Sequence, residues 1–236
     1  VRRPVRVACF FTGDELVMPG EPLKPGGIYN SNRFLVTALL KRLGCVVTDL
    51  GIVGDTLAET RDALRSAAGR SDLIVTSGGM SVGEEDHVKP AVEAEGELDL
   101  WQIAMKPGKP LAYGRVRRGA DGFAHFIGLP GNPVSSFVTF LLFVRPFILA
   151  SQGATRLVPA ATTLVAEFDW PKPDRRREFL RACLDPETGR LTLFPNQGSA
   201  VLTSTVAGDG LVDNPPGQVI RRGDPVRFLP FADLLN

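Results

Sequence analysis

The chain has 236 residues, of which 44% are hydrophobic and 22% charged, the balance of a globular protein with a sizeable core. This length exceeds what most single α/β domains need, so two domains are expected. With 27 basic and 26 acidic residues, the net charge is only +1. That balance argues against a nucleic-acid partner, because a sequence-independent nucleic-acid surface needs a clear cationic excess. Any anionic ligand must be held by local groups.

Several features point to the cytoplasm. The longest apolar stretch, Phe137–Val144, is far shorter than the roughly 20 residues that span a bilayer, and no signal peptide opens the chain. Cys9, Cys45 and Cys183 are far apart and suggest neither a disulfide framework nor a zinc site. We therefore expect no membrane association. The chain starts at Val1 and enters a strand-like run at once, so we also expect a fragment of a longer protein.

Strand and helix patterns alternate in the first part of the chain. Apolar β-type runs predict strands at 5–11, 45–50, 73–76, 111–113 and 123–127. Helical patterns cover 33–43, 56–68 and 134–150. Thr56 and Glu59 fit a capping box at the start of the second helix, and Pro133 stands where a helix start tolerates proline. This alternation predicts right-handed βαβ units with a parallel sheet, and we place this α/β domain at residues 1–152.

The pattern changes after Ser151. Alternating runs between Gly, Pro and Asp turns predict strands at 162–168, 179–184, 191–194, 218–220 and 226–229. We expect a small all-β domain at residues 153–236.

Acidic residues follow three predicted strands of the α/β domain. Glu15 lies in TGDEL, Asp55 in the turn after the second strand, and Asp86 at the end of SGGMSVGEED. Ligands of parallel sheets bind beyond the carboxyl ends of the strands, so the βαβ pattern predicts that these loops meet at one cleft. Each acid alone is more often a turn or cap residue, but three on one sheet edge are harder to explain in that way.

The SGGMSVGEED loop has the composition of a phosphate site that needs a cation. Gly78 and Gly79 let backbone amides approach an anion closely, and the hydroxyls of Ser77 and Ser81 add donors. The acids at the end of the loop would repel a phosphate unless a divalent cation lay between them, most simply Mg²⁺. An exposed turn with an acidic helix start explains the same residues.

Two proline-rich segments follow. KPGKP presents Lys106 and Lys109 on a stiff segment, and two fixed cations can neutralise a doubly charged oxyanion; ordinary surface lysines are the alternative. GLPGNP leads rigidly into the helix at 134–150, whose first amides with Ser135 form a plausible anion site, unless the turn is purely architectural. No serine or cysteine nucleophile has its base at recognisable spacing, so chemistry should rest on metal, charge and position.

Five motifs, TGDEL, IYNSN, SGGMSVGEED, KPGKP and GLPGNP, in this order resemble the C-terminal half of the molybdopterin molybdenumtransferase family. This is the bacterial MoeA type, related to plant E domains and to the gephyrin E domain. The resemblance is strong over 5–150 and looser afterwards. It implies a three-layer α/β molybdopterin-binding domain with a mostly parallel sheet, followed by a small all-β, barrel-like domain.

The resemblance also implies a function, that of a molybdenum insertase. In molybdenum cofactor biosynthesis, molybdate is transferred onto the dithiolene of adenylylated molybdopterin and AMP is released, with Mg²⁺ required. Full-length members carry two further domains before this region, and a homodimer completes their cleft. The chain alone is therefore expected to bind ligand yet turn over poorly or not at all. Contact with the adenylyltransferase of the same pathway is a further expected interaction.

Site roles are carried over motif by motif. The resemblance implies that three acids hold the divalent cation on the pyrophosphate and, with two lysines, form the catalytic set: Glu15, Asp55, Asp86, Lys106 and Lys109. It implies that molybdate is received by Lys106, Lys109 and Ser135, and that the β domain adds Arg176, Arg181 and Ser199. The remaining expected substrate-binding residues are Thr12, Gly13, Ser77, Gly78, Gly79, Ser81, Pro130, Gly131, Asn132 and Pro133.

Two other functions remain open. A molybdopterin adenylyltransferase shares the fold, but that family looks more like GGTG where this chain has GGMS, and it lacks KPGKP and the β domain. A scaffold like the gephyrin E domain would bind a receptor peptide. Asp55, Asp86, Lys106 and Lys109 argue instead for active chemistry.

Overall fold

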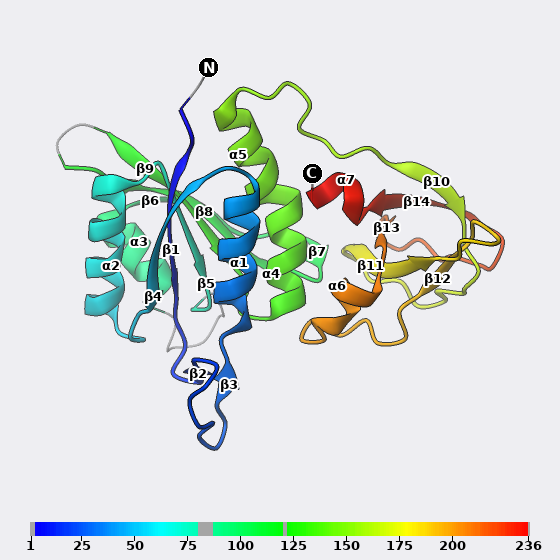
Figure 1. Cartoon of the computed structure of the whole chain (residues 1–236), viewed down its shortest axis with the longest axis horizontal. Helices are drawn as coiled ribbons and strands as arrows, with labels where there is room; N and C mark the ends of the chain where they lie inside the picture. Colours follow the sequence, from blue (N-terminus) through cyan, green and yellow to red (C-terminus); the bar gives the residue numbers. More distant parts are fainter. Residues whose placement is uncertain (1–2, 80–86, 120–121, 236) are drawn as a thin grey trace.

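The computed structural model describes residues 3–79, 87–119 and 122–235, which form an α/β unit and a smaller β unit side by side (Figure 1). The α/β unit contains a six-stranded sheet in the order β4-β1-β5-β9-β8-β6. Its strands are β1 Arg6–Phe11, β4 Val46–Ile52, β5 Leu73–Ser77, β6 Gly96–Gln102, β8 Pro110–Arg117 and β9 Phe123–Leu129. The first four in sheet order run parallel, while β8 and β6 are antiparallel to their neighbours. The sheet is therefore mostly parallel, as predicted, although β6 was not foreseen.

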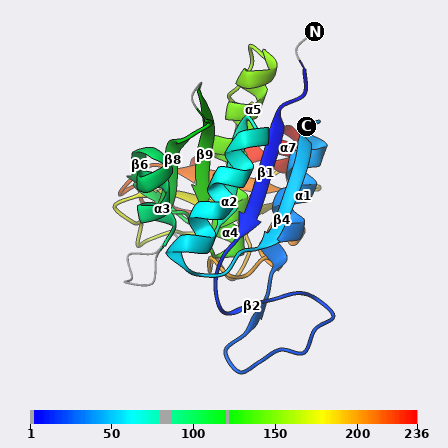
Figure 2. The ribbon, with the colours of Figure 1, turned by 90° about the vertical axis from the view of Figure 1, so that its left-hand side faces the viewer.

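Helices cover both faces of this sheet. On one face lie α1 Ser31–Arg42 and the helical stretch α4 Pro133–Thr139, η1 Phe140–Val144 and α5 Arg145–Gln152. On the other lie α2 Leu57–Arg70 and α3 Val88–Glu95, which Figure 2 shows in front of the sheet. The side chains of β1 alternate between two core clusters, with Val7, Cys9 and Phe11 in one and Ala8 and Phe10 in the other. This period of two is what a strand covered on both faces produces, and it builds three layers.

Local sequence signals explain where two of these helices begin. In α2, Glu59 N donates to Thr56 Oγ1 over 3.2 Å, as in a capping box. The Glu59 carboxylate, however, accepts from the Thr56 hydroxyl over 2.7 Å rather than from a backbone amide. Asn30 caps α1, because its side-chain oxygen accepts from Arg33 N over 3.1 Å.

The helical stretch from Pro133 to Gln152 is the longest apolar element. Its 20 residues are long and apolar enough to cross a membrane by composition alone, but most of them are buried inside the molecule. A one-turn π-helix, η1, lies in its middle. Phe137, Phe140, Leu141, Val144 and Ile148 belong to the larger core cluster, so this is a core helix between the two units.

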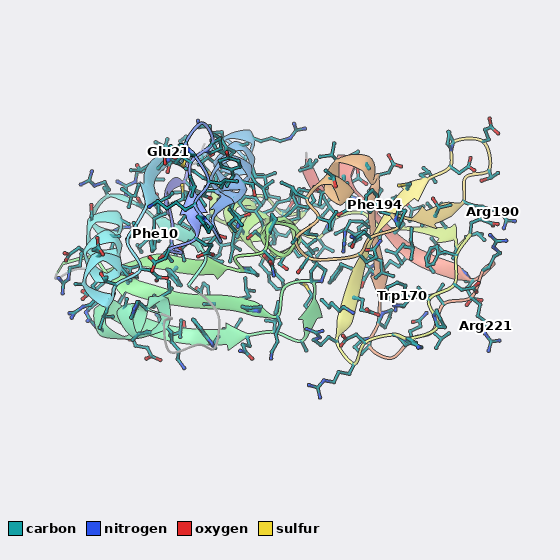
Figure 3. All side chains as sticks on the ribbon, turned by 90° about the horizontal axis from the view of Figure 1, so that it is seen from below. Phe10, Glu21, Trp170, Arg190, Phe194 and Arg221 are labelled. Carbon is teal, nitrogen blue, oxygen red and sulfur yellow. The ribbon has the colours of Figure 1, made fainter. Side chains whose placement is uncertain are left out.

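The β unit contains a five-stranded antiparallel sheet in the order β10-β14-β13-β11-β12. Its strands are β10 Thr162–Val165, β11 Arg177–Leu184, β12 Leu191–Leu193, β13 Gly210–Asn214 and β14 Pro225–Pro230. An isolated bridge between Ala166 and Leu191 joins the end of β10 back to β12, which gives the sheet its barrel-like closure. The strand predicted at 218–220 is wrong, because only Ile220 forms a bridge, to Trp170. Arg190 and Arg221 lie at the end of this unit farthest from the α/β unit (Figure 3).

The two units share a boundary with a continuous core. Strand β7, Met105–Lys106, leaves the α/β unit and pairs in parallel with β11, so that Lys106 is opposite Glu178. The short helix α7, Phe231–Leu235, places Phe231 edge-on against Phe137 with 5.3 Å between ring centroids. The larger core cluster accordingly includes residues of both units. A small two-stranded arm, β2 Leu16–Val17 with β3 Ile28–Tyr29, projects from the α/β unit (Figure 1).

Candidate functional site

A cleft of about 540 Å³ opens at the carboxyl ends of the parallel strands. The loops after β1 and β5 reach it, as the βαβ pattern predicts, together with the loop after β9 and the start of α1, whereas Asp55 of the third predicted loop is not among the lining residues. Of the residues predicted to bind substrate, the cleft is lined by Thr12, Ser77, Gly78, Gly79, Pro130, Gly131, Asn132, Pro133 and Ser135, and also by Glu15. Most of the predicted substrate-binding residues, from three separate motifs, are thus brought together.

The glycine loop packs directly against the TGDEL loop. Thr12 N donates to Ser77 O over 3.2 Å, which continues the β1–β5 pairing into the loops. Gly78 has a φ of +98°, and a Cβ built on it would lie 2.0 Å from Thr12 O. Only glycine accepts both the left-handed backbone and this approach. The requirement for glycine therefore comes from the shape of the cleft floor.

Buried polar side chains tie three motifs together beneath the cleft. Asn32 of IYNSN donates from Nδ2 to Ser77 Oγ over 2.8 Å and to Gly131 O over 2.7 Å. Ser77 Oγ in turn donates to Pro130 O over 2.9 Å, and Ser136 Oγ also donates to Pro130 O. These contacts fix the glycine loop, the GLPGNP turn and the start of α1 as one rigid wall.

The GLPGNP turn also contacts the β unit. Pro133 occupies the first position of α4, and Val134 N donates to Ser199 O over 3.0 Å. Ser199 therefore meets the predicted anion site through its backbone carbonyl, and its neighbour Ala200 lines the cleft. Ser135, at the same helix start, is 4% exposed.

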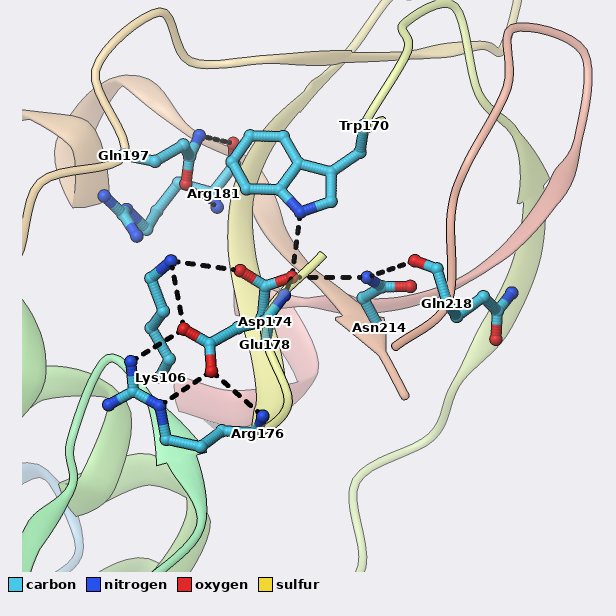
Figure 4. Close-up of polar contacts among 9 residues, drawn as sticks. All are labelled: Lys106, Trp170, Asp174, Arg176, Glu178, Arg181, Gln197, Asn214 and Gln218. Carbon is cyan, nitrogen blue, oxygen red and sulfur yellow. Dashed lines mark hydrogen bonds and ion pairs between the residues drawn. The ribbon is translucent and has the colours of Figure 1, made fainter. Parts of the chain in front are cut away.

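A second hollow of about 400 Å³ lies at the boundary between the units. Its polar lining comes from Lys106, Glu178, Arg181 and Gln197, with Trp170 beside them (Figure 4). Pro110 and Ala200 line the cleft, and Lys106, Pro107 and Gly198 of the same two segments line the second hollow, although no described residue lines both.

Glu178 is the buried carboxylate of this second hollow. Its side chain is 0% exposed, and Oε2 accepts from Trp170 Nε1 over 2.8 Å and from Asp174 N over 3.0 Å. Lys106 Nζ lies 3.3 Å from Glu178 Oε1 and 3.5 Å from Asp174 Oδ2. The ammonium group of Lys106 is thereby held at the boundary by carboxylates of the β unit (Figure 4).

Arg181 is a buried cation whose described hydrogen-bond partners carry no charge. It is 1% exposed and donates from Nε to Ser204 Oγ over 3.1 Å and from Nη2 to Gly198 O over 3.0 Å. Burial lowers the pKa of Arg181 to about 10. A buried guanidinium held by neutral acceptors favours an anion, and such a group fits the oxyanion role predicted for this arginine.

Lys109 and Arg176 lie in a third, exposed hollow of about 600 Å³ with Asp174 and Arg175. Arg176 forms paired bonds to Asp174, with Nε to Oδ1 at 2.9 Å and Nη2 to Oδ2 at 2.8 Å. These bonds to Arg176 lower the pKa of Asp174 below its usual range. Arg176 is thus already paired, whereas Lys109 forms part of the open wall of this hollow.

This arrangement corrects one expectation. Lys106, Lys109 and Ser135 were expected to receive molybdate together, but Lys106 lines the second hollow, Lys109 the third and Ser135 the cleft. The reason is the pairing of β7 with β11, which carries Lys106 to Glu178 and away from the cleft floor. Only Pro110 of the KPGKP segment reaches the cleft itself.

The predicted cation site can be tested on two of its three acids. Glu15 lines the cleft, and Asp55 Oδ1 accepts from Thr12 Oγ1 over 3.1 Å, one residue behind the lining. Asp86 and Ser81 lie outside the described residues. Within the described ranges no three acidic, histidine or cysteine side chains form a metal-binding group. Two carboxylates from neighbouring loops still fit Mg²⁺, which takes one or two carboxylates and completes its shell with water and substrate phosphates.

Sequence reasoning gave no role to several residues of these hollows. Asn30 and Asn32 were visible in IYNSN but were left without a function. Asp174, Glu178 and Trp170 carried no local signal, because their importance comes from a contact between segments about 70 residues apart, such as Lys106 with Glu178. An acid within an arginine-rich strand was the one available hint.

The fold and these hollows define an α/β ligand-binding protein whose cleft adjoins a basic hollow supplied by a small β unit. Residues 8–150 match the family described as a probable molybdopterin-binding domain, and residues 163–231 match the MoeA C-terminal region, domain IV. The chain belongs to this molybdopterin-binding family. The resemblance to molybdopterin molybdenumtransferases and the predicted fold class are thereby confirmed.

Known relatives agree with this family assignment. The chain is 44% identical over 240 residues to a molybdopterin molybdenumtransferase of Haemophilus influenzae, with 99% of this chain and 58% of the relative covered. It is 33% identical over 216 residues to molybdopterin molybdenumtransferase 2 of Mycobacterium tuberculosis, with 89% and 52% covered. A solved molybdopterin biosynthesis MoeA protein from Pyrococcus horikosii superposes with a TM-score of 0.80 at 29% identity, covering 97% of this chain and 55% of that one. The chain thus spans about half the length of these relatives, and they support a role in molybdenum cofactor biosynthesis.

Proposed function

We propose that this chain is the ligand-binding half of a molybdenum insertase, which transfers molybdate onto the dithiolene of adenylylated molybdopterin with release of AMP. The observation that carries the proposal is Arg181, a buried guanidinium with neutral hydrogen-bond partners, which lines the second hollow together with Lys106. A tetrahedral oxyanion in this hollow would supply the negative charge that its described partners lack.

The proposed division of labour follows from charge. The cleft holds the pterin and pyrophosphate parts of the substrate against the glycine loop. Glu15 and Asp55, with Asp86, would hold Mg²⁺, which neutralises the pyrophosphate when bound. Lys106 and Arg181 orient molybdate and stabilise its charge beside the dithiolene, and Lys109 adds a cation at the open side. Breaking the phosphoanhydride with water then releases AMP.

The alternatives are less well supported. A molybdopterin adenylyltransferase would use the cleft, but the match of residues 163–231 to the MoeA C-terminal region gives this chain a β unit that the sister family lacks. A gephyrin-like scaffold would have no use for a buried cation next to Lys106. We also propose that the protein acts as a cytoplasmic homodimer, because the resemblance places part of the cleft on a partner subunit.

Release of AMP tests the proposal. The chain is incubated with adenylylated molybdopterin, molybdate and Mg²⁺, with and without the missing half of the protein. We expect AMP release when both halves are present, and at least a tenfold loss in Lys106→Ala and Arg181→Met, since each removes a charge from the proposed oxyanion site. Glu187→Gln, an exposed change in a turn of the β unit, serves as control. Undiminished AMP release in both variants would refute this assignment.

A further inference from the structure

Two asparagines of the cleft wall carry buried polar atoms with no hydrogen-bond partner among the described residues. They are Nδ2 of Asn30 and Oδ1 of Asn32. Both residues line the cleft, with Asn30 at 1% and Asn32 at 8% exposure. Buried polar groups are nearly always paired, so two orphaned atoms in one cleft wall indicate a ligand that completes them.

In each amide, the hydrogen bonds of one polar atom fix the orientation of the group. Asn30 Oδ1 is used in capping α1, where it accepts from Arg33 N, so Nδ2 is the atom left to donate. Asn32 Nδ2 donates to Ser77 Oγ and to Gly131 O, so Oδ1 is the atom left to accept. A flip of either side chain would break these bonds. The wall therefore presents one donor and one acceptor two residues apart on the first turn of α1.

This pattern selects the chemistry of the ligand. A phosphate or molybdate offers only acceptors at its oxygens and cannot satisfy Asn32 Oδ1. A nitrogen heterocycle whose polar edge bears both an N–H and a carbonyl or ring nitrogen offers a partner to each of the two atoms. The rest of the cleft suits a flat ring, since Tyr29, Pro110 and Pro130 give it aromatic and apolar surface.

We propose that Asn30 and Asn32 form a donor–acceptor pair that binds the polar edge of a heteroaromatic ring of the substrate. The assignment rests on the proposed function for the identity of the ring. Both the pterin and the adenine of adenylylated molybdopterin carry such an edge. Asn30 and Asn32 would thus determine ring specificity, while the cationic hollow at Lys106 and Arg181 binds the oxyanion.

Asn30→Ser gives a sharp test. Serine is as good a helix cap as asparagine, so the variant keeps the cap of α1 and replaces the Nδ2 donor by a hydroxyl on a shorter side chain. Asn30→Asp keeps the cap and replaces the donor by an acceptor. Gln152→Ala removes an amide at the end of α5, which bonds Leu43 O away from the cleft, and serves as the matched control. Thermal melting of each variant checks that the fold is retained.

Binding is measured by calorimetry on the full chain without molybdate or metal, using two pairs of ring probes. AMP is compared with IMP, whose ring reverses the donor and acceptor at the equivalent edge, and pterin is compared with lumazine, which replaces the 2-amino group by a carbonyl. We expect the unaltered chain to prefer one member of one pair by about tenfold, the value of a hydrogen bond and its mismatch. The pair that is discriminated identifies the ring.

Asn30→Ser should weaken the preferred ring about three- to tenfold and remove most of the discrimination, and Asn30→Asp should remove it fully. Gln152→Ala should bind like the unaltered chain. Equal binding of all four probes, or discrimination that survives in folded Asn30→Ser and Asn30→Asp, would overturn the inference. Because these measurements use neither molybdate nor turnover, they can fail while AMP release succeeds, and they can succeed while AMP release fails.

Discussion

The buried carboxylate Glu178 makes a quantitative prediction possible. Replacing it by alanine leaves Trp170 Nε1–H and the Asp174 amide without the acceptor that they reach over 2.8 and 3.0 Å. Each stranded donor costs about 1 to 2 kcal/mol. The pair with Lys106 adds less than about 1 kcal/mol, because the lysine side chain is 45% exposed and its charge remains solvated. Together Glu178→Ala should lower the free energy of unfolding by about 3 to 4 kcal/mol.

Glu178→Gln separates hydrogen bonding from charge. The amide oxygen of glutamine can still accept from Trp170 and Asp174, so only the charge-assisted part of these bonds and the attraction to Lys106 are lost. Because the variant no longer buries a charge, part of this loss is offset, and we expect the free energy of unfolding to fall by about 1 kcal/mol. The alanine variant should therefore melt roughly 10 °C below the unaltered chain, and the glutamine variant only a few degrees below it.

Urea unfolding followed by tryptophan fluorescence measures both changes. The chain has two tryptophans, and Trp170 contacts Glu178 directly, so its emission reports on this site, while far-UV circular dichroism reports on the whole chain. Exposed Glu187→Gln is the control for removing a carboxylate elsewhere in the β unit. If Glu178→Ala and Glu178→Gln differ by less than about 0.5 kcal/mol, the acceptor role assigned to Glu178 is wrong.

Three further predictions follow from single sites. Gly78→Ala should cost at least 2 kcal/mol more in urea unfolding than Gly223→Ala, because both glycines have similar φ values, +98° and +95°, but only at Gly78 would a Cβ meet a neighbour, 2.0 Å away. Arg181→Met should lower the affinity for tungstate, measured by calorimetry, at least tenfold. It should lower the free energy of unfolding less than Glu178→Ala does, because burial already disfavours the charge of Arg181. A variant that binds tungstate as tightly as the unaltered chain would contradict this. Bonds from Arg3 and Arg6 lower the pKa of Asp72 below the usual range of an aspartate, so this carboxylate stabilises the fold at neutral pH and loses its contribution as the pH falls below about 4. Asp72→Asn should therefore lower the melting temperature at pH 7, and the difference in melting temperature from the unaltered chain should become smaller below about pH 4. A difference that stays constant with pH would contradict the role of the ion pair.

The parallel part of the fold could be predicted because its signals are local. Strands β1, β5 and β9 are short apolar runs, and their burial on both faces explains why no polar alternation interrupts them. Strand β6, GELDLWQ, was missed because it is an edge strand with acidic residues, and its pairing with β8 comes from outside its own sequence. Strand β13 contains Asp213 and Asn214, residues depleted in strands, and is stabilised by β11 and β14 on either side.

In the candidate site, too, the features with local sequence signals could be predicted and those that depend on distant contacts could not. The convergence of the loops after β1 and β5 follows from topology, so this part of the cleft could be predicted without any contact being known. The position of Lys106 could not, because it depends on β7 crossing to β11 and on Glu178, whose burial no local pattern reveals. The orphaned atoms of Asn30 and Asn32 also required the structure, since the sequence shows the amides but not which half of each is already used.

The boundary between the units sets the geometry of the proposed reaction. The cleft belongs mainly to the α/β unit, whereas Arg181 and Glu178 of the cationic hollow belong to the β unit. The contacts that fix their relative position include the β7–β11 pairing, the bond from Val134 N to Ser199 O, and the packing of Phe137 on Phe231. Transfer of molybdate between such sites requires the oxyanion and the dithiolene to lie within bonding reach, and a shift of about 1 Å can cost a hundredfold in rate. Phe231 at this boundary therefore affects the reaction only by positioning the two units. Phe231→Ala should lower AMP release while leaving the binding of ring probes to the cleft unchanged.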